Sequence, residues 1–450
     1  MQAPLDTTPP PARPPKKTRK VPQPLPGGAE RFIPVSRYGL RAKLVKMLVA
    51  GGGDAHDWGR ALDCLAAWRH QDHRKRLHDL LENYLPFSPD SDTVHLIEFD
   101  QAQRDQAQRD FVAGIEQALA QANYIRLSRD DVQRLLIERS PYGLHLNVDL
   151  REFDEALLYY RGTGTIVREE RNPWRLYLTK DRLEIPIFLR LFLLLKLKPA
   201  QTRVAEIMAA TGATEARAAR TLRKARAHMP LGVSSEHIYV KMFKRIPQID
   251  LEMLFPNTKV AFRPRDKLKL MVTAGGGTVA GVTGPATKLL AATNPFTLAF
   301  GVAGLSAVVF RQVMKFFNTR NRYMMVLAQN LYFCSLANNH GALTLISDRA
   351  EEEDVKEDML LYAFLARHPA KYDALPAIKQ EATAFLQESC GVSVDFDAED
   401  ALRRLLADGL VRSDADGNLT AIAPGEARAH LDTLWDRVLD TDSDYAAARA

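Results

Sequence analysis

The sequence predicts an α+β protein, mainly helical, with a transmembrane helical hairpin and a C-terminal winged-helix-like domain. Two adjacent apolar segments, about 270–287 and 289–310, lie in a chain of 450 residues whose mean hydropathy is only -0.23. Helical periodicity dominates on either side of this pair, whereas residues 156–197 alternate in the manner of β-strands. Residues 376–422 then read as two helices followed by two short strands around a turn, the pattern of a winged helix.

The composition, with 46% hydrophobic and 26% charged residues, is that of a globular protein of two or three domains. The expected units, in chain order, are a disordered proline-rich basic tail at 1–29, a helical N-terminal domain at 30–150, an α+β membrane-proximal basic domain at 151–266, the transmembrane helical hairpin at 267–315, a helical connector at 316–368, a winged-helix-like acidic domain at 369–440 and a disordered tail at 441–450.

The first half of the chain predicts helices before strands. Residues 31–84 read as helical with an interruption at Gly51–Gly53, and a further helix is expected near 104–124. The apolar stretch Ile185–Leu197 contains Arg190 and is too short to cross a bilayer. We therefore expect a buried strand or a surface-lying segment there.

A pair of helices is predicted at 202–228, around a turn at Thr211–Thr214. Its second helix carries basic residues, Arg217, Arg220, Arg223 and Arg226. This pattern fits either a DNA-binding helix-turn-helix or a basic hairpin that faces lipid headgroups or another subdomain. The neighbouring apolar pair favours the second interpretation, so nucleic acid is the less favoured partner.

The apolar pair itself reads as two helices joined by a turn, with Lys288 as its one internal charge. Glycines predict close packing of its arms: Gly277, Gly281, Gly301 and Gly304. Basic residues flank the pair on both outer sides, and by the positive-inside rule both termini are then cytoplasmic. A buried hairpin inside a soluble domain is the alternative.

Charge divides the chain into two regions with different expected partners. From Asp348 onward there are 23 acidic and 11 basic residues, a net charge of -12, so the first 347 residues carry +18 of the total of +6. The basic region predicts contact with an anionic lipid bilayer. The acidic C-terminal domain predicts a protein partner, because its second helix begins Asp397-Ala-Glu-Asp400 and would repel phosphates.

No constellation of residues specifies a reaction, so we predict no catalytic residue, no metal and no cofactor, and lean against an enzyme. His70 and His73 share a helix face but make only half a zinc site, and a solvated charged face explains them better. Glu353 and Glu357 are one turn apart, yet residues 351–354 suit the negative first turn of a helix. The three cysteines are too scattered for a disulfide framework.

Two strings, Ile238-Tyr-Val-Lys-Met-Phe-Lys-Arg-Ile-Pro-Gln-Ile-Asp-Leu-Glu-Met-Leu-Phe-Pro256 and Asn330-Leu-Tyr-Phe-Cys-Ser-Leu-Ala-Asn-Asn339, resemble the transmembrane protein 143 family. The resemblance implies an uncharacterised membrane protein with no established activity. Animal relatives are associated with mitochondria, but the proline-rich N-terminus here favours a bacterial inner membrane.

The first of these strings also contributes most of a candidate functional cluster, which consists of Arg161, Lys241, Lys244, Arg245, Asp250 and Glu252. Structural coupling to the hairpin is favoured over a ligand site for this cluster. We therefore expect a membrane-anchored scaffold or sensor on an anionic membrane surface, and an oligomer is compatible with the sequence. The alternatives are a membrane-bound enzyme or lipid-handling protein that uses Arg161, Asp250 and Glu252, and a membrane-tethered transcription regulator.

Overall fold

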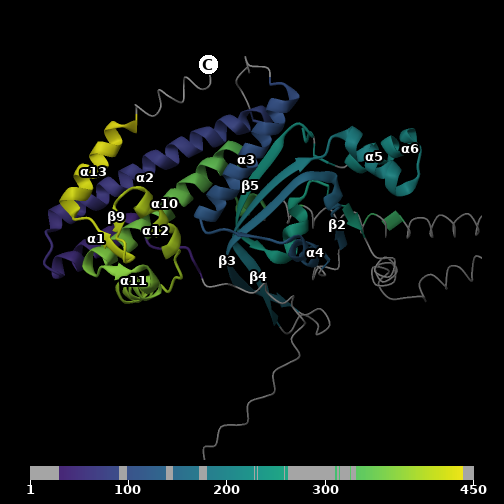
Figure 1. The fold of residues 1–450 in the computed structure, drawn as a ribbon. Coiled ribbons are helices and arrows are strands. Elements are labelled where there is room, and N and C mark those ends of the chain that lie inside the picture. Colours follow the sequence, from purple (N-terminus) through teal and green to yellow (C-terminus); the bar gives the residue numbers. More distant parts are fainter. Residues whose placement is uncertain are drawn as a thin grey trace, which may run out of the picture.

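The computed structural model describes residues 30–90, 99–137, 145–171, 180–227, 229–230, 232–257, 259–261, 310–311, 314, 325 and 331–438. An antiparallel sheet lies at the centre, and long helices cover one of its faces (Figure 1). A helical unit with its own small sheet lies at one end of the molecule, and a separate pair of short helices lies at the other.

Five strands form the central sheet in the order β1-β3-β4-β5-β7, and each neighbouring pair is antiparallel. Their bounds are β1 Ile125–Arg126, β3 Phe153–Arg171, β4 Lys180–Leu197, β5 Ile238–Pro247 and β7 Ser335–Asn338. Strand β4 is apolar on both faces: Phe192 and Leu194 contact the core beneath the helices, whereas Leu191 and Leu193 contact a core on the other face. Burial on both sides explains its continuous apolar run. Of the two alternatives that the sequence left open there, a buried strand or a surface-lying segment, the structure has the buried strand.

Most of the longer helices lie in the regions where the sequence predicts helices. Their bounds are α1 Arg37–Ala50, α2 Ala55–Tyr84, α3 Gln101–Gln121, α4 Arg129–Ile137, α5 Ala200–Thr211, α6 Glu215–Arg226, α10 Asn339–Arg367, α11 Leu375–Cys390, α12 Ala398–Ala407 and α13 Pro424–Asp436. Local chemistry sets several starts, since Asp54 caps α2 and Asp100 with Gln103 forms a capping box on α3. A 3-10 helix, η4 Gln248–Leu254, follows β5, and β2 His145–Asn147 pairs with β6 Lys259–Ala261.

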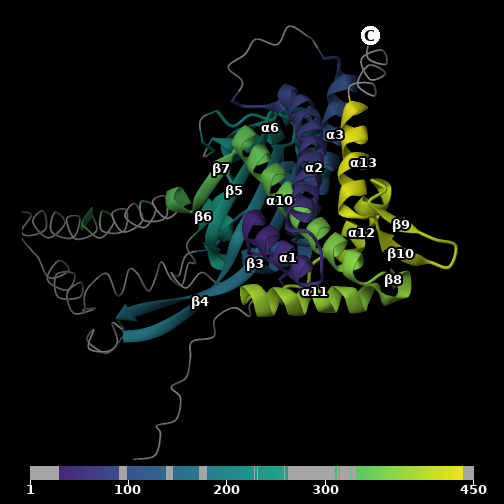
Figure 2. The ribbon, with the colours of Figure 1, turned by 90° about the vertical axis from the view of Figure 1, so that its left-hand side faces the viewer.

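Residues 370–421 form the small end unit. After α10 come β8 Ala370–Lys371, α11, α12, β9 Val411–Ser413 and β10 Asn418–Ala421, and the sheet order is β8-β10-β9. This helix–strand–helix–helix–strand–strand order is that of a winged helix. Asp397 caps α12 by accepting from the backbone N–H of Asp400, at the position where the sequence predicts that this helix begins. Helix α13 returns alongside α2 (Figure 2).

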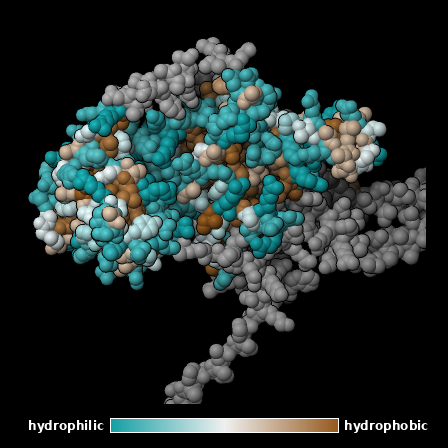
Figure 3. Space-filling view, viewed as in Figure 1, coloured by the Kyte–Doolittle hydropathy of each residue, from teal (hydrophilic) through white to brown (hydrophobic). Residues whose placement is uncertain are grey.

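Helices α2 and α10 each pass through two hydrophobic cores. One end of each packs against the sheet, where Tyr84 of α2 and Leu343 of α10 are buried. The other end packs in the core of the end unit, together with α1, α11 and α12. The described surface in Figure 3 is mainly hydrophilic, with small separate apolar patches.

The predicted fold class is wrong in its transmembrane hairpin, because no helix within the described ranges is both long and apolar enough to cross a bilayer. The longest helices, α2 and α10, have 30 and 29 residues, and charged side chains interrupt both. Their length spans two protein cores. Positions 267–315 lie outside the described residues except for 310, 311 and 314, and so do the predicted packing glycines Gly277, Gly281, Gly301 and Gly304.

Candidate functional site

A layer of buried charge separates the two cores that α2 and α10 share. On α10 it comprises Glu353, Asp354, Lys356, Glu357 and Asp358, each at most 2% exposed. Ala350 before them packs in the sheet core, and Met359 after them packs in the core of the end unit. The prediction that residues 351–354 begin a helix is wrong, since α10 begins at Asn339 and they lie inside it.

Arg404 of α12 is the main counter-charge of this layer. Its guanidinium lies 3.0 Å from Asp354 Oδ1, 3.1 Å from Glu357 Oε2 and 2.9 Å from Asp358 Oδ1, and it also pairs with Asp400. Burial alone would lower the pKa of Arg404, but these carboxylates raise it above its usual value. One arginine thus joins the end unit to the middle of α10.

Carboxylates outnumber cations in the layer, and their pKa values reflect it. Burial raises the pKa of Glu357 to about 8, although Arg404 opposes the shift. Burial likewise raises the pKa of Asp358 to about 6 against the effects of Arg404 and Arg69. Glu357 therefore holds a proton near neutral pH more readily than an exposed glutamate does.

Helix α2 contributes Arg69 and His73 to the charged layer. Arg69 donates to Asp358 at 2.9 Å and to Asp408 at 2.5 Å, and His73 Nε2 lies 3.0 Å from Asp354 Oδ2. His73 is only 3% exposed, so the predicted solvated face is wrong for it. The sequence shows the spacing of His73 on its helix but gives no sign of its partner, which lies 281 positions later.

The layer also offers the one group of metal-type ligands found among the described residues, formed by Asp354, Glu357 and Asp400, whose ligand oxygens lie within 4.8 Å of one another. Arg404 contacts all three carboxylates. Because the guanidinium already supplies the positive charge that a divalent ion would bring, this group does not fit a metal.

The segment at 30–35, which precedes α1, contacts the layer through Ile33. The backbone N–H of Ile33 donates to Glu353 Oε2 at 2.9 Å, and Lys356 Nζ donates to the carbonyl of Ile33 at 2.5 Å. Phe32 lies between two cations, with Arg161 Cζ 3.8 Å and Lys356 Nζ 4.5 Å from its ring centroid. The segment therefore connects the sheet to α10.

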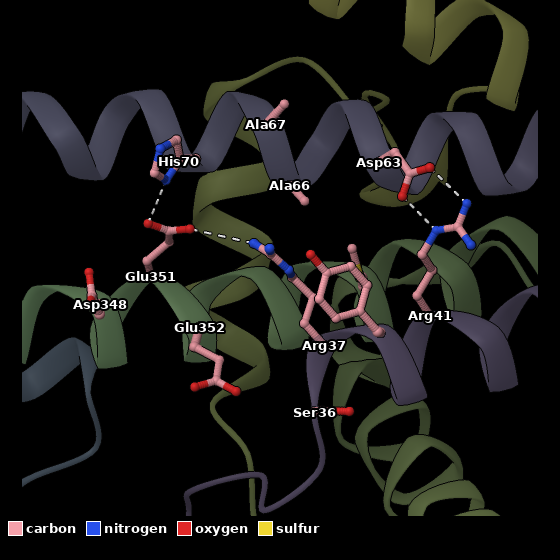
Figure 4. A pocket seen from close by; sticks show the side chains of 12 residues that line it. Ser36, Arg37, Arg41, Asp63, Ala66, Ala67, His70, Asp348, Glu351 and Glu352 are labelled. Carbon is pink, nitrogen blue, oxygen red and sulfur yellow. Dashed lines mark hydrogen bonds and ion pairs between the residues drawn. The ribbon is translucent and has the colours of Figure 1, made fainter. Parts of the chain in front are cut away.

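A surface depression of about 690 Å³ lies near the layer, between α1, α2 and α10 (Figure 4). Most of its charged lining is paired internally: His70 Nδ1 lies 2.8 Å from Glu351, Arg37 lies 3.5 Å from the same carboxylate, and Arg41 lies 2.6 Å from Asp63. These pairs join the three helices. They leave no converging set of donors for a ligand.

The predicted functional cluster divides in the structure. Lys241, Lys244 and Arg245 are exposed on β5, whereas Asp250 and Glu252 are buried in η4. Burial and Asp250 raise the pKa of Cys334 and Lys244 lowers it, so the charges of these two predicted residues act on one thiol.

Arg161 lies on β3 under the helices, where it is 8% exposed. The sheet nevertheless aligns it with Lys244 through Arg190 of β4, because Arg161 pairs with Arg190 and Arg190 pairs with Lys244. Sequence reasoning missed the role of Arg190. Its only signal was a charge inside an apolar strand.

The α5–α6 pair is held to the sheet by its inner arginines. Arg203 donates to Glu152 at 2.8 Å and to Asp149 at 3.0 Å, and Arg226 donates to the carbonyl of Lys198 at 2.9 Å. Gly212 ends α5 with a φ of +64°, which glycine adopts without strain. The two predicted helices are confirmed, and their outer surface is free of these contacts.

Part of the chain matches a known family model. Residues 153–341 match a family model described as a protein of unknown function (DUF3754). The matched range includes β3 to β7 and the α5–α6 pair, and it ends just after α10 begins. The aligned residues Arg161, Arg190 and Lys244 lie inside the matched range, whereas Glu353 to Asp358 lie beyond it. No solved structure matches the chain.

Proposed function

We propose that the protein is a scaffold that docks on an anionic membrane surface through the outer face of α6. The observation that carries this proposal is a set of exposed cations on that helix, namely Arg217, Arg220, Arg223 and Lys224. Within the described parts of the chain, none of them has an ion-pair partner. At 100° per residue they occupy an arc of about 120°, and the buried Ala218 and Leu222 lie opposite.

Like charges three or four positions apart destabilise a helix. An anionic surface would remove that repulsion and would attract each Lys or Arg by about 1 kcal/mol. The contrast with Arg203 and Arg226, which acidic groups and carbonyls hold at the base of the same pair, supports an external partner for the outer face.

Lipid phosphates explain the composition of this face better than DNA bases do. Helix α6 has no asparagine or glutamine, the side chains that pair with adenine, and its exposed cations suit backbone-type phosphate contacts. The winged-helix-like unit suits DNA less well, because α12 buries Arg404 against α10 and its exposed Arg403 pairs with Asp400. Its N-terminal turn is acidic, with Glu399 exposed.

The acidic end unit is our candidate surface for a protein partner. Its exposed carboxylates are spread over α11, the β9–β10 turn and α13: Glu381, Glu388, Asp414, Asp416, Glu426 and Asp432. Chemical crosslinking of the membrane-bound protein, compared with an Asp414→Asn/Asp416→Asn variant, tests this. A crosslink that the variant retains at full yield argues against the β9–β10 turn as the contact.

Vesicle co-sedimentation of the full chain tests membrane docking. We expect the protein to bind vesicles that contain about 30 mol% phosphatidylglycerol, which imitate an anionic leaflet. It should not bind vesicles of pure phosphatidylcholine. Changing all four α6 cations to glutamine should lower the partition coefficient by about 10² to 10³, because about 4 kcal/mol of attraction is lost.

The matched control removes the same charge from α1 and α2, at the exposed positions Lys43, Lys46, Arg60 and Arg74. It should bind as the unmodified protein does. Equal loss in both variants, or no loss in the α6 variant, contradicts the proposal. Displacement of the protein from vesicles by low concentrations of duplex DNA would favour the helix-turn-helix interpretation instead.

A further inference from the structure

Three cations lie side by side across the central sheet. Arg161 of β3 is the Cα partner of Arg190 on β4, which is in turn the partner of Lys244 on β5. Directly opposed residues on neighbouring strands point to the same face. That face is the helix-covered one, since Phe192 and Leu194, two and four positions after Arg190, pack in the helix-side core.

Such a row is unfavourable by itself. Like charges directly opposite each other destabilise a sheet, and no carboxylate among the described residues lies within ion-pair distance of any of the three. Arg190 lowers the pKa of Arg161 in addition to the larger effect of burial. Glu353 and Glu30 act on Arg161 from a distance, but Glu353 is engaged by Ile33 and Lys356, and Glu30 by the N–H of Phe32.

An independent observation marks the same place. The hydroxyl of Tyr124 is buried and has no hydrogen-bond partner, and Tyr124 is 6% exposed. Arg161 Cζ lies 5.1 Å from its ring centroid. Burial raises the pKa of Tyr124, while Arg161, Arg190 and Arg349 all oppose that shift, so the charges of three arginines act on this side chain. Arg349 itself pairs with Glu352 at 2.5 Å.

Donors therefore collect here without an acceptor. Arg161 is held in place by stacking on Phe32 and donates one hydrogen bond, to the carbonyl of Ala122 at 3.3 Å. Arg190 donates to the carbonyl of Leu189, next to it in the chain. The other guanidinium donors have no protein acceptor among the described residues. The buried Tyr124 hydroxyl also lacks a partner, which is unfavourable for a buried polar group.

We propose that Arg161, Arg190 and Lys244, with the Tyr124 hydroxyl, bind a phosphate-bearing anion. Arginine forks suit the tetrahedral oxygens of phosphate, and lysine adds a point charge. Lys244 is exposed and Arg190 is partly exposed, so the anion reaches the row from the β5 side. This site uses none of the α6 residues, and it goes beyond the docking function proposed above.

Thermal unfolding of the full chain with inorganic phosphate, against chloride at equal ionic strength, provides the first test. Phosphate should raise the midpoint in a saturable manner, and the binding curve gives a dissociation constant. Arg190→Gln and Lys244→Gln should each raise that constant about tenfold or more, because each removes a charge-assisted hydrogen bond. Tyr124→Phe should weaken binding less.

The matched control is Lys241→Gln, which removes an exposed cation from the same strand but on the other pleat of β5. It should bind phosphate as the unmodified protein does. In the absence of phosphate, Arg190→Gln should be as stable as the unmodified protein or more stable, since repulsion is relieved. A merely structural arginine would instead lose stability.

A second arm distinguishes the source of the phosphate. The α6 quadruple variant, in which docking through α6 is removed, is unfolded in the presence of phosphatidic acid vesicles and, separately, of free inorganic phosphate. Retained stabilisation by free phosphate in that variant supports a soluble ligand, and stabilisation by phosphatidic acid alone supports a lipid headgroup. If neither probe discriminates Arg190→Gln from Lys241→Gln, the proposed site is refuted.

Discussion

Replacing Arg404 with methionine removes the cation shared by four carboxylates while keeping most of the side-chain volume. Asp354, Glu357 and Asp358 lie 2.9 to 3.1 Å from its guanidinium. Removing one partner of a buried ion pair costs about 3–5 kcal/mol, because the other charge stays buried without compensation. At about 2–4 °C for each kcal/mol, the unfolding midpoint should fall by about 6–20 °C.

The loss of stability can be measured by tryptophan fluorescence during urea or thermal unfolding, with Trp58 and Trp68 as the reporters. Trp58 is packed in the core of the end unit, and Trp68 Nε1 donates to Asp408, beside the charged layer. The loss should be larger at pH 8 than at pH 5, because the unpaired carboxylates bind protons at the lower pH and the repulsion among them then disappears.

Arg403→Met is the control, one position away on the same helix. Its side chain is 76% exposed and pairs with Asp400 at the surface, so the expected loss is at most about 1 kcal/mol. If Arg404→Met lowers the midpoint no more than Arg403→Met does, or if its effect is independent of pH, the charged layer does not hold the end unit to α10 as we infer.

Three further predictions follow from the same structure. Stability should fall as the pH rises from about 5 to 8, because the folded state binds the protons of Glu357, with a pKa of about 8 against the usual 4.5, and Asp358 more tightly than the unfolded chain does. Glu357→Gln should flatten this slope in unfolding curves measured across that range, and an unchanged slope would contradict the assignment. EDTA should leave the unfolding midpoint unchanged, since Arg404 already neutralises the carboxylate group that resembles a metal site. If EDTA lowers the midpoint and added divalent ions restore it, the carboxylate group does bind a metal. Gly162→Ala should lose about 1–2 kcal/mol, because Gly162 has a φ of +69° and an added Cβ would lie 2.9 Å from Leu189 Cδ1. Gly164→Ala, where the nearest atom is 3.4 Å away, should lose clearly less, and equal losses would refute the strain argument.

Local patterns in the sequence located most of the elements. The apolar run Ile185–Leu197 predicts a buried strand or a surface-lying segment, the spacing around Thr211–Thr214 predicts two helices, and Asp397 predicts the start of α12. Each of these depends on residues within a few positions of one another, so periodicity and capping chemistry suffice. The same local reasoning was wrong for residues 351–354, because a run of acids resembles a helix start whether or not it is buried.

Tertiary structure alone decided which charges meet. Nothing in the neighbourhood of His73 predicts its burial against Asp354, and nothing near Arg404 predicts that it joins α10, since both pairings depend on how two long helices align between two cores. Register is equally non-local: Arg161, Arg190 and Lys244 form one row only because three antiparallel strands pair at those positions, and a shift of one residue would turn a side chain to the other face. The sequence by itself determined where most of the longer helices and strands lie and how charge is divided along the chain. The packing of those elements determined the buried charged layer and the unpaired basic row.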